Sequence, residues 1–346
     1  MQNTLLITGG AGFIGSALVR LLIKNTDYLI VNIDKLTYAG NLDSLREVKH
    51  NARHVFKHLD ICDKDAISAI FRQYQPQGII HLAAESHVDR SIIGSAEFIQ
   101  TNIIGTYTLL ECAREYYANL VNKTGFKFVH VSTDEVFGSL ENSGFFNETT
   151  SYDPRSPYSA SKASSDLLAR AWFHTYNLPI IVTNCTNNYG PYHFPEKLIP
   201  LVINNALQLK NLPIYGKGNN IRDWLYVDDH VQGLWLAFKA GRVGESYCIG
   251  GHNERTNIEV VETICQILDG LKPRADGKSY TQLITYVTDR AGHDYRYAMD
   301  PTKIQTELGW APIESFDTGI RKTVQWYLDN QDWVRNIFDV HTRKVV

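Results

Sequence analysis

Several features that would assign the chain to a specialised class are missing from the sequence. Its five cysteines are scattered and none forms a Cys-x-x-Cys pair, so neither a disulfide framework nor a zinc cluster is predicted. No apolar run is long enough to span a membrane. The formal net charge is only −3, which leaves no overall basic field to attract nucleic acid. We therefore expect no membrane or nucleic-acid partner, and an anionic ligand would need local cationic side chains.

Composition and the start of the sequence set the broad class. With 44% hydrophobic residues among 346, the chain can bury a large core, and its length fits one large α/β domain that carries a smaller lobe. The first residues lack the basic and apolar regions of a secretory leader, so we expect a cytoplasmic protein. His50, His54 and His58 are regularly spaced, but residues 54–59 have the pattern of a strand and not of a helix, so no metal site is predicted.

The first half of the sequence alternates short apolar runs with amphipathic segments. The apolar runs predict strands at residues 5–8, 28–33, 54–59, 78–83, 126–132 and 180–184. The segments between them predict helices near residues 14–24, 63–74, 97–117 and 157–176. This alternation is typical of a parallel sheet covered by helices on both faces. The predicted fold class is α/β, a Rossmann-type doubly wound parallel sheet with a smaller C-terminal substrate-binding lobe.

The local composition of the sequence changes after about Tyr189. Prolines and glycines become frequent, as they do in loops and between short helices. We therefore expect a dinucleotide-binding Rossmann domain over residues 1–190 and the substrate-binding lobe over residues 191–346. The helix-like residues 227–240 are expected to return to the first domain, so the boundary is not a single point.

A glycine-rich segment follows the first predicted strand and opens the first predicted helix. In TGGAGFIG, Gly9, Gly12 and Gly15 let the backbone approach a pyrophosphate at the N–H groups of the helix N-terminus, although a plain turn has similar glycines. Asp34 ends the second strand, where its carboxylate can bind the adenosine ribose and would repel a 2′-phosphate. Together these features predict NAD as the cofactor, and the neighbouring Lys35 softens the preference over NADP only slightly.

A tyrosine and a lysine four residues apart begin the helix predicted at residues 157–176. Tyr158 and Lys162 share one helix face, as an ordinary exposed pair also would. A tyrosine with a pKa near 10 needs about 4 kcal/mol of stabilisation to act as a base near neutral pH. A lysine cation at ~5–6 Å supplies roughly 3 kcal/mol of this, and a nicotinamide cation could supply the remainder. With the glycine motif upstream, we predict Tyr158 as a base and Lys162 as its partner and as a ligand of the nicotinamide ribose.

Two adjacent carboxylates end the fifth predicted strand, in the run Ser132-Thr133-Asp134-Glu135. The carboxyl edge of a parallel sheet is where ligands bind in such folds. A helix cap or a solvated turn would also use these residue types. We predict instead that Asp134 and Glu135 form an acid–base pair, in which the environment separates the two pKa values.

These motifs together resemble the extended short-chain dehydrogenase/reductase family, and most specifically its members that dehydrate dTDP-glucose. The likeness extends along nearly the whole chain, and it is carried by the segments ITGGAGFIGS, NIDKLTYAGN, HLAAESHVDRS, STDEVFG, SPYSASKASSD, TNCTNNYGPYHFPEKLIP, LPIYGKG, IRDWLYVDDH and YCIGGHNE. The glycine motif alone indicates only the superfamily. Thr133-Asp134-Glu135 is more selective, because related epimerases differ at the acid pair.

The resemblance implies a lyase reaction with named roles for five residues. Tyr158, assisted by Lys162, would take the proton of the sugar 4-hydroxyl while NAD accepts hydride from C4, and Thr133 would hydrogen-bond the 4-oxygen. Glu135 would then remove the proton at C5, which the 4-keto group has acidified. Asp134 would protonate the 6-hydroxyl as it leaves as water, and hydride would return to C6. The net reaction is a dehydration within deoxysugar biosynthesis, such as that of rhamnose.

The resemblance also implies a set of ligand contacts. Besides Tyr158 and Lys162, the residues implied for NAD are Gly9, Gly12, Phe13, Ile14, Gly15, Asp34, Lys35, Leu36, Thr37, Asp60, Ile61, Leu82, Ala83, Ala84, Glu85, Ser86, Thr101 and Asn188. Besides Thr133, those implied for the nucleotide sugar are Ser86, Asn187, Lys197, Leu198, Pro213, Ile214, Tyr215, Arg222, Asn257, Asp289, Arg290, Ala291, Gly292 and His293. Lys197, Arg222 and Arg290 supply cations for the diphosphate.

Two departures from the family pattern and several alternatives remain. Phe137 stands where the family more often has tyrosine, and Ala291 where proline is usual, and neither position takes part in proton transfer. Another nucleotide-sugar dehydratase or a 4-epimerase of the same fold is an alternative, and so is a non-catalytic NAD-sensing protein. The resemblance further implies a homodimer that pairs the aromatic helices near residues 107–117 and 172–176.

Overall fold

The structure, a computed structural model, describes residues 3–290 and 292–344, with side chains as far as residue 337. Its centre is a seven-stranded sheet in the order β10-β6-β5-β4-β1-β2-β3, in which every neighbouring pair is parallel. The strands are β1 (Thr4–Thr8), β2 (Leu29–Asp34), β3 (His54–His58), β4 (Gly78–His81), β5 (Lys127–Thr133), β6 (Ile180–Cys185) and β10 (Ser246–Ile249). The predicted fold class is confirmed, as are the six strands predicted from apolar runs.

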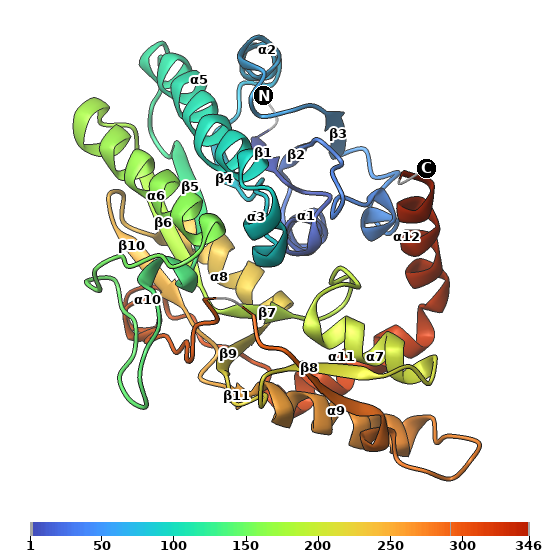
Figure 1. The fold of residues 1–346 in the computed structure, drawn as a ribbon. Helices are drawn as coiled ribbons and strands as arrows, with labels where there is room; N and C mark the ends of the chain where they lie inside the picture. The colour runs from blue at the N-terminus through green and yellow to red at the C-terminus, as the bar shows by residue number, and fades with distance from the viewer. Residues whose placement is uncertain (1–2, 291, 345–346) are drawn as a thin grey trace.

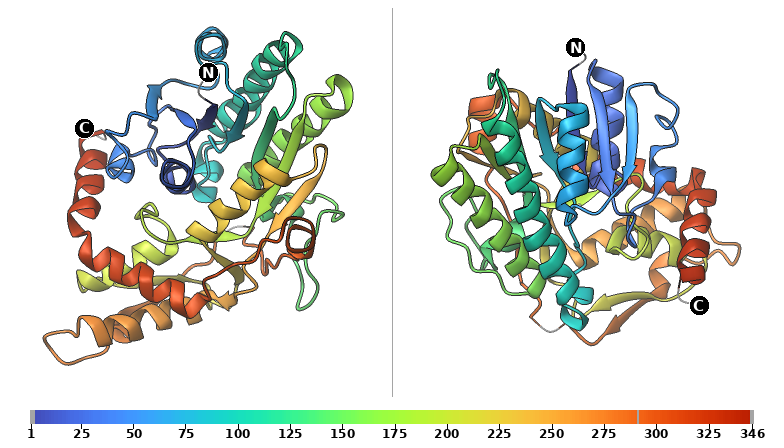
Figure 2. Two further views of the ribbon diagram at one scale, coloured as in Figure 1. Left: turned by 180° about the vertical axis from the view of Figure 1, so that it is seen from behind. Right: turned by 90° about the horizontal axis from the view of Figure 1, so that it is seen from above.

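Helices cover both faces of this sheet (Figure 1, Figure 2). One layer contains α1 (Phe13–Asn25), α8 (Val227–Ala240) and α10 (Thr302–Leu308), and the other contains α2 (Lys64–Tyr74), α5 (Thr106–Ala118) and α6 (Pro157–Tyr176). The segment predicted as one helix at 97–117 is continuous but irregular, running through α4 (Ala96–Phe98) and the π-helical η2 (Ile99–Gly105) into α5. The short α3 (Val88–Ile93) precedes it.

Local sequence signals fix where these helices begin and end. Ser156 and Ser159 form a reciprocal capping box at the start of α6, with Pro157 at its first position. The Asp63 side chain accepts from Ala66 N at the start of α2. Both helices end in a left-handed residue, Asn177 for α6 and Gln75 for α2. Such caps provide partners for backbone groups that would otherwise have none at the helix ends, so they define where each helix begins and ends.

The two layers pack on separate apolar clusters. Leu18, Leu22 and Val231 belong to the cluster between the sheet and the α1–α8 layer, and all three are fully buried. Phe71, Leu109 and Phe128 belong to the cluster on the opposite face. Because both faces of the central strands are covered, their sequences are nearly continuous apolar runs.

The C-terminal lobe has its own small sheets and its own core. β7 (Asn187–Tyr189), β9 (Ile221–Tyr226) and β11 (Glu254–Thr256) form one sheet, and β8 (Leu212–Tyr215) and β12 (Ile284–Val287) form another. The helices of this lobe are α7 (Leu198–Leu207), α9 (Asn257–Leu271), α11 (Phe316–Asp329) and α12 (Gln331–Lys344). Three short helical turns complete the described elements, namely η1 (Leu42–Leu45), η3 (Asp134–Phe137) and η4 (Tyr280–Leu283).

Two elements from the second half of the chain belong to the main sheet and its helical layer. β10 pairs with β6 at the sheet edge, and α8 packs against α1. The sequence does not predict β10, because Ser246–Ile249 is too short for its periodicity to be informative. We propose a dinucleotide-binding domain of residues 1–190 that also includes 227–249, with the rest of 191–346 as the second lobe. Across the described residues, no helix is long and apolar enough to cross a membrane.

Candidate active site

A cavity of about 560 Å³ lies between the two lobes, at the carboxyl ends of β1, β4 and β5. The strand order reverses between β1 and β4, where the chain leaves the sheet in opposite directions. A crevice forms at such a switch point, and doubly wound sheets bind their ligands there. The cavity also reaches β8 and β9 of the second lobe, through Ile214 and Arg222.

The glycine-rich loop forms the floor of one end of this cavity. Gly9 has a φ of +73°, and a Cβ on it would lie 2.6 Å from Ala83 N. A Cβ on Gly15 would lie 2.1 Å from Gly9 O, so the helix could not approach the loop so closely. Gly12 differs from both, because its Cβ would meet only Gly9 O, at 3.2 Å, among the described residues. Gly9 and Gly15 are therefore required by the fold, whereas Gly12 keeps the cavity open.

The N-terminus of α1 is built to hold an anion. Gly12 caps the helix without a side-chain hydrogen bond, and the first turn contains no acidic residue. The first N–H groups of α1 thus face the cavity with the positive end of the helix dipole. This open cradle fits the pyrophosphate of a dinucleotide, so the residues present are compatible with NAD.

Asp34 and Asp60 mark the adenosine end of the cavity. Asp34 Oδ2 accepts from Ala11 N at 2.9 Å and Oδ1 accepts from Leu36 N at 2.8 Å, which fixes the carboxylate at the end of β2. Burial raises the pKa of Asp34, and these two hydrogen bonds oppose the rise. Lys35 pairs with Asp60 across 2.8 Å. Lys35 is thereby engaged by a carboxylate, and Asp34 and Asp60 both line the cavity.

The acid pair follows β5 in the tight turn η3. The Thr133 hydroxyl donates to Asp134 Oδ1 at 3.2 Å and accepts from Glu135 N at 3.3 Å, so one threonine orients both residues. Asp134 is only 2% exposed, and its Oδ2 has no hydrogen-bond partner among the described residues. Burial, and then the neighbouring Glu135, raise the pKa of Asp134 well above its usual range. The raised pKa favours the protonated form of Asp134, whose Oδ2 faces no hydrogen-bond partner among the described residues.

Glu135 has a different electrostatic environment. Burial raises its pKa, but the cations of Arg290, Lys197 and Arg222 oppose that rise. Glu135 is only partly buried, and it lines the same cavity as Asp134. The two adjacent carboxyl groups are thus pushed apart in acidity, with Asp134 the better proton donor and Glu135 the better acceptor.

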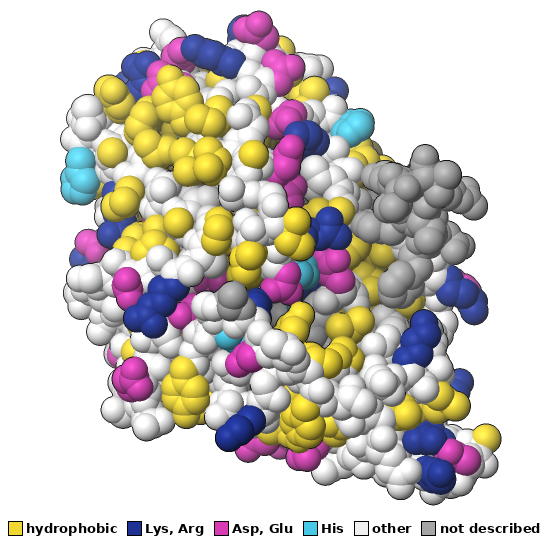
Figure 3. Space-filling model, viewed as in Figure 1, with side chains coloured by type: hydrophobic (Ala, Val, Ile, Leu, Met, Phe, Trp, Pro, Cys, Tyr) yellow, Lys and Arg dark blue, Asp and Glu magenta, His cyan; other side chains and the backbone are white. Residues whose placement is uncertain are grey.

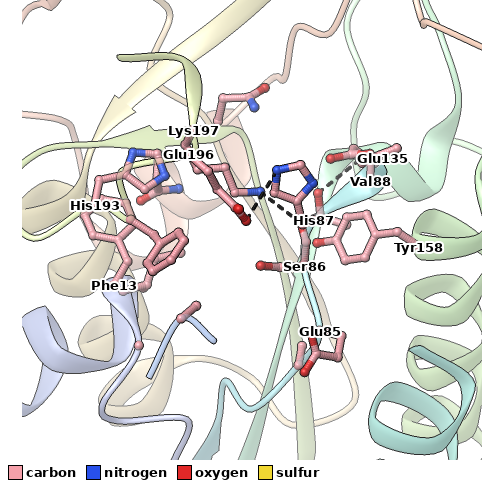
Figure 4. Close-up of a pocket in the computed structure, with 18 of the residues that line it drawn as sticks. Phe13, Glu85, Ser86, His87, Val88, Glu135, Tyr158, His193, Glu196 and Lys197 are labelled. Carbon is pink, nitrogen blue, oxygen red and sulfur yellow. Dashed lines mark hydrogen bonds and ion pairs between the residues drawn. The ribbon is translucent and has the colours of Figure 1, made fainter. Parts of the chain in front are cut away.

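Tyr158 and Lys162 lie on α6 and line the same cavity as the acid pair. Figure 4 shows Tyr158 close to Glu135. Tyr158 is buried, and burial followed by the charge of Glu135 raises its pKa well above its usual range. Lys162 Nζ donates to Val131 O at 2.8 Å, and burial lowers the pKa of Lys162. The protein groups by themselves hold Tyr158 as a neutral phenol, so the cationic charge expected of a bound nicotinamide matters for its ionisation.

Three cations reach the other end of the cavity from separate segments. Lys197 Nζ donates to Ser86 O at 3.1 Å, which links the two lobes (Figure 4). The guanidinium of Arg222 lies 4.2 Å above the Tyr297 ring and donates to Asp294 O at 3.0 Å. Arg290 contributes the third positive charge. A diphosphate is the ligand that this convergence fits best.

Most residues expected at the site from the sequence lie on the cavity wall. They are Gly9, Gly12, Phe13, Ile14, Gly15, Asp34, Lys35, Thr37, Asp60, Ile61, Leu82, Ala83, Ala84, Glu85, Ser86, Thr101, Thr133, Asp134, Glu135, Tyr158, Lys162, Asn187, Asn188, Lys197, Leu198, Pro213, Ile214, Tyr215, Arg222, Asn257, Arg290 and His293. Residues far apart in sequence meet here because parallel strands carry their carboxyl ends to one edge.

Three expected residues do not lie on that wall. Leu36 has a φ of +54° and its side chain packs against the core beside α1. The Asp289 side chain is half exposed and pairs with His293 Nδ1 at 2.7 Å, so it positions a cavity residue from outside. Gly292 is also absent from the wall. Ala291 lies outside the described residues.

Several cavity residues were not predicted. His193 stacks on Phe13 with the ring centroids 4.2 Å apart, and Glu196 lies 3.4 Å from His87 and 2.9 Å from Arg90 (Figure 4). Glu196 comes directly before Lys197, which the sequence predicts at the site, and this adjacency is the one sequence feature that indicates Glu196 as a cavity residue. The ion pairs themselves join segments from different lobes, so no local pattern indicates them.

A Rossmann sheet with a glycine cradle and a Tyr–Lys pair beside an acid pair is the arrangement of a dinucleotide-dependent enzyme of the extended short-chain dehydrogenase/reductase type. Comparison with known proteins agrees and is more specific. The family model described as GDP-mannose 4,6 dehydratase matches residues 6–323. The chain is 62% identical over 344 residues to a dTDP-glucose 4,6-dehydratase of Salmonella typhimurium, covering 96% of this chain and 95% of that protein.

Solved structures give the same result. The dTDP-glucose 4,6-dehydratase DesIV of Streptomyces venezuelae, determined with NAD bound, superposes with a TM-score of 0.87 at 45% identity, covering 95% of this chain and 98% of that one. A UDP-glucose 4-epimerase of Thermotoga maritima superposes with a TM-score of 0.83 at 29% identity, covering 95% and 99%. The chain belongs to the dTDP-glucose 4,6-dehydratase family, within the wider group that the GDP-mannose 4,6 dehydratase model describes.

Proposed function

We propose that this chain is an NAD-dependent hydro-lyase that converts dTDP-glucose to dTDP-4-keto-6-deoxyglucose and water. The family relation supports the reaction, and the glycine cradle with Asp34 supports the cofactor. Bound NAD would take up hydride from C4 of the sugar and return it to C6, so no net oxidation occurs. All proton transfers in this proposal belong to side chains of the chain itself.

The proton transfers follow the positions of the side chains. Tyr158 removes the 4-hydroxyl proton, while the Thr133 hydroxyl hydrogen-bonds the 4-oxygen. The resulting 4-keto group acidifies the C5 proton, which Glu135 takes. Asp134 gives its proton to the 6-hydroxyl, which leaves as water, and the C5–C6 double bond forms. Hydride at C6 and the proton that Glu135 returns to C5 would complete the product. The proton taken up by Tyr158 is released and Asp134 takes up a proton, so the net change is the loss of one water.

The observation that carries this proposal is the contrast between the two adjacent carboxyl groups. Asp134 is buried with an unpaired oxygen, and burial raises its pKa well above the usual range. Burial also raises the pKa of Glu135, but the positive charges of Arg290, Lys197 and Arg222 oppose this rise. Elimination of water needs one donor and one acceptor at neighbouring carbons, which is what this pair offers.

The fold relation to a UDP-glucose 4-epimerase favours one alternative, 4-epimerisation of a nucleotide sugar. An epimerase uses the Tyr–Lys pair and NAD but has no hydroxyl to expel. The acid pair would then have no function, although burying two carboxyl groups is costly. The dehydratase therefore accounts for more of the site.

We propose that the chain works as a homodimer. Six exposed apolar side chains form a patch on α3, η2, α5 and α6, consisting of Ile93, Ile99, Ile104, Tyr107, Leu167 and Tyr176. Figure 3 shows hydrophobic side chains gathered over α5 and α6. A patch of this kind is characteristic of a subunit interface.

A cytoplasmic location is part of the same proposal, supported by five cysteines that are all free thiols.

Mass spectrometry of product tests the function directly. The purified chain is incubated separately with dTDP-glucose, UDP-glucose and GDP-mannose. Loss of one water from dTDP-glucose without net reduction of NAD is the expected result. Loss of water only from another nucleotide sugar would overturn the nucleotide assignment. An unchanged mass with a new 4-epimer would establish the epimerase. No change in any sugar would favour a non-catalytic NAD-binding protein.

A further inference from the structure

A buried carboxylate lies directly beneath the site and has no part in the reaction described above. Asp166 is on α6, one turn after Lys162 and on the same helix face. Its relative exposure is 0%, although an isolated buried carboxylate is costly. The free-energy cost of burying this carboxylate must be offset by hydrogen bonds and nearby positive charge. The residues that provide them therefore indicate the role of Asp166.

Four donors converge on Asp166 from three other parts of the chain. Ser132 Oγ donates to Oδ2 at 2.8 Å, Tyr152 OH at 2.9 Å and Asn184 Nδ2 at 3.4 Å. His130 Nε2 lies 3.0 Å from Oδ1, and it must be the donor, because an ionised carboxylate only accepts. The charged form of Asp166 is thus fully hydrogen-bonded.

These contacts hold the end of the catalytic strand. His130 and Ser132 are on β5, directly before Thr133 and Asp134. Asn184, which donates to Asp166, also donates to Thr133 O at 3.1 Å. The carboxylate therefore ties β5 and β6 to the face of α6 from which Lys162 and Tyr158 project, one and two turns earlier.

Asp166 is also the nearest carboxylate along α6 to the buried ammonium of Lys162, one helical turn away, and its charge acts on that ammonium. Burial lowers the pKa of Lys162, and Asp166 and Cys185 are the acidic groups that oppose this. The other groups around the pair carry little countercharge. Burial lowers the pKa of His130 and keeps it neutral, and Tyr152 is a neutral phenol whose hydroxyl also accepts from Arg170 at 3.1 Å.

We propose that Asp166 is a positioning residue for the reaction, acting as the buried counter-ion of Lys162 and as the anchor for the end of β5. The inference rests on the proposed function, because the charge on Lys162 matters only if Tyr158 acts as a base. Asp166 acts through Lys162 and Thr133 and does not itself contact the substrate.

Asp166→Asn removes the charge with little change in shape. Each donor around it can adapt to an amide, because the hydroxyls of Ser132 and Tyr152 can rotate to accept. His130 can change tautomer, since its Nδ1 has no hydrogen-bond partner among the described residues. Asp166→Ser, which also donates and accepts, is a second charge-removing variant in case the first does not fold.

The measurement is the pH profile of kcat for dTDP-glucose dehydration. Removing a nearby anion lowers the pKa of both Tyr158 and Lys162, so the whole profile of either Asp166 variant should move to lower pH, by about one to three pH units. On the alkaline limb, a profile displaced by about one pH unit corresponds to a roughly tenfold loss of kcat at fixed pH. Ser132→Ala, which keeps the charge and loses one hydrogen bond, should lower kcat without moving the profile.

Asp229→Asn is the matched control. Asp229 is 3% exposed and accepts from Glu314 N at 2.9 Å, so the same substitution is made in an equally buried site. Its profile should coincide with that of the wild type. A folded Asp166→Asn or Asp166→Ser variant whose kcat falls equally at every pH would overturn the inference and leave the proposed function intact. A wild-type chain that dehydrates no nucleotide sugar would overturn both.

Discussion

Replacing Asp134 by asparagine should separate the acid step from the rest of the reaction. The amide has nearly the shape of the carboxylic acid, and its oxygen can keep the hydrogen bond that Thr133 Oγ1 makes to Asp134 Oδ1 at 3.2 Å. It has no acidic proton to give to the departing hydroxyl. Positioned general acids contribute about 10²–10⁴ in rate, equivalent to about 2.7–5.4 kcal/mol of transition-state stabilisation. We expect kcat to fall by that factor.

The assay follows each step separately. In Asp134→Asn, oxidation at C4 and proton removal at C5 remain possible, because Tyr158 and Glu135 are unchanged. Stopped-flow absorbance should therefore show NAD becoming reduced, and substrate recovered from deuterated water should carry deuterium at C5. Glu135→Gln is the comparison, which should still reduce NAD but lose the exchange at C5.

Stability provides an independent check on the same residue. Because burial raises the pKa of Asp134 in the folded protein, its favourable contribution is fully present below the unfolded pKa and is lost as pH rises through the folded pKa. The substituted amide does not titrate, so Asp134→Asn should gain stability relative to the wild type as pH rises. The reasoning is refuted if a stably folded Asp134→Asn loses NAD reduction together with elimination, or if its kcat falls less than tenfold.

Two further predictions concern other parts of the site. Gly12→Ala should fold normally but weaken NAD binding at least tenfold by calorimetry, since its Cβ meets little protein and projects where the pyrophosphate is expected. Gly270→Ala is the control: a Cβ there meets open space, so this variant should gain about 0.5–1 kcal/mol of folding stability and bind NAD as the wild type does. Equal NAD affinities of the Gly12→Ala variant and the wild type would contradict the cradle. Burial raises the pKa of Asp223 from 3.8 to about 6. The free energy of unfolding of the wild type, relative to Asp223→Asn, should therefore fall by about 3 kcal/mol between roughly pH 3 and pH 8 in urea titrations, and a pH-independent difference would oppose this assignment.

The sequence predicts most of the main sheet because its central strands are buried on both faces. Residues such as Leu5–Thr8 and Ile180–Asn184 then form continuous apolar runs whose ends carry the functional residues. Gly12, Asp34 and Asp134 each follow the end of a strand and could be placed at one edge, since parallel strands share the direction in which they end. Tyr158 was predicted from its spacing to Lys162 at the start of a helix.

Features that depend on contacts between distant segments could not be predicted. The pairing of β10 with β6 and the approach of Glu196 to His87 join parts of the chain that no local pattern connects. Leu36 stands among NAD-site residues in the sequence, but its positive φ turns its side chain to the core. The network around Asp166 also has no sequence signature, because its donors come from β5, β6 and the loop before α6.

Burial is the common physical cause of the chemistry at this site. It raises the pKa of Asp134, of Glu135 and of Tyr158, and by itself would leave all three protonated. Selective placement of cations then distinguishes them. The charges of Arg290, Lys197 and Arg222 oppose the rise in the pKa of Glu135, whereas the charge of Glu135 adds to the burial-driven rise in the pKa of Asp134, which Arg222 opposes. The uneven distribution of charge around the two adjacent carboxyl groups thus separates their pKa values, as the proposed acid and base roles require.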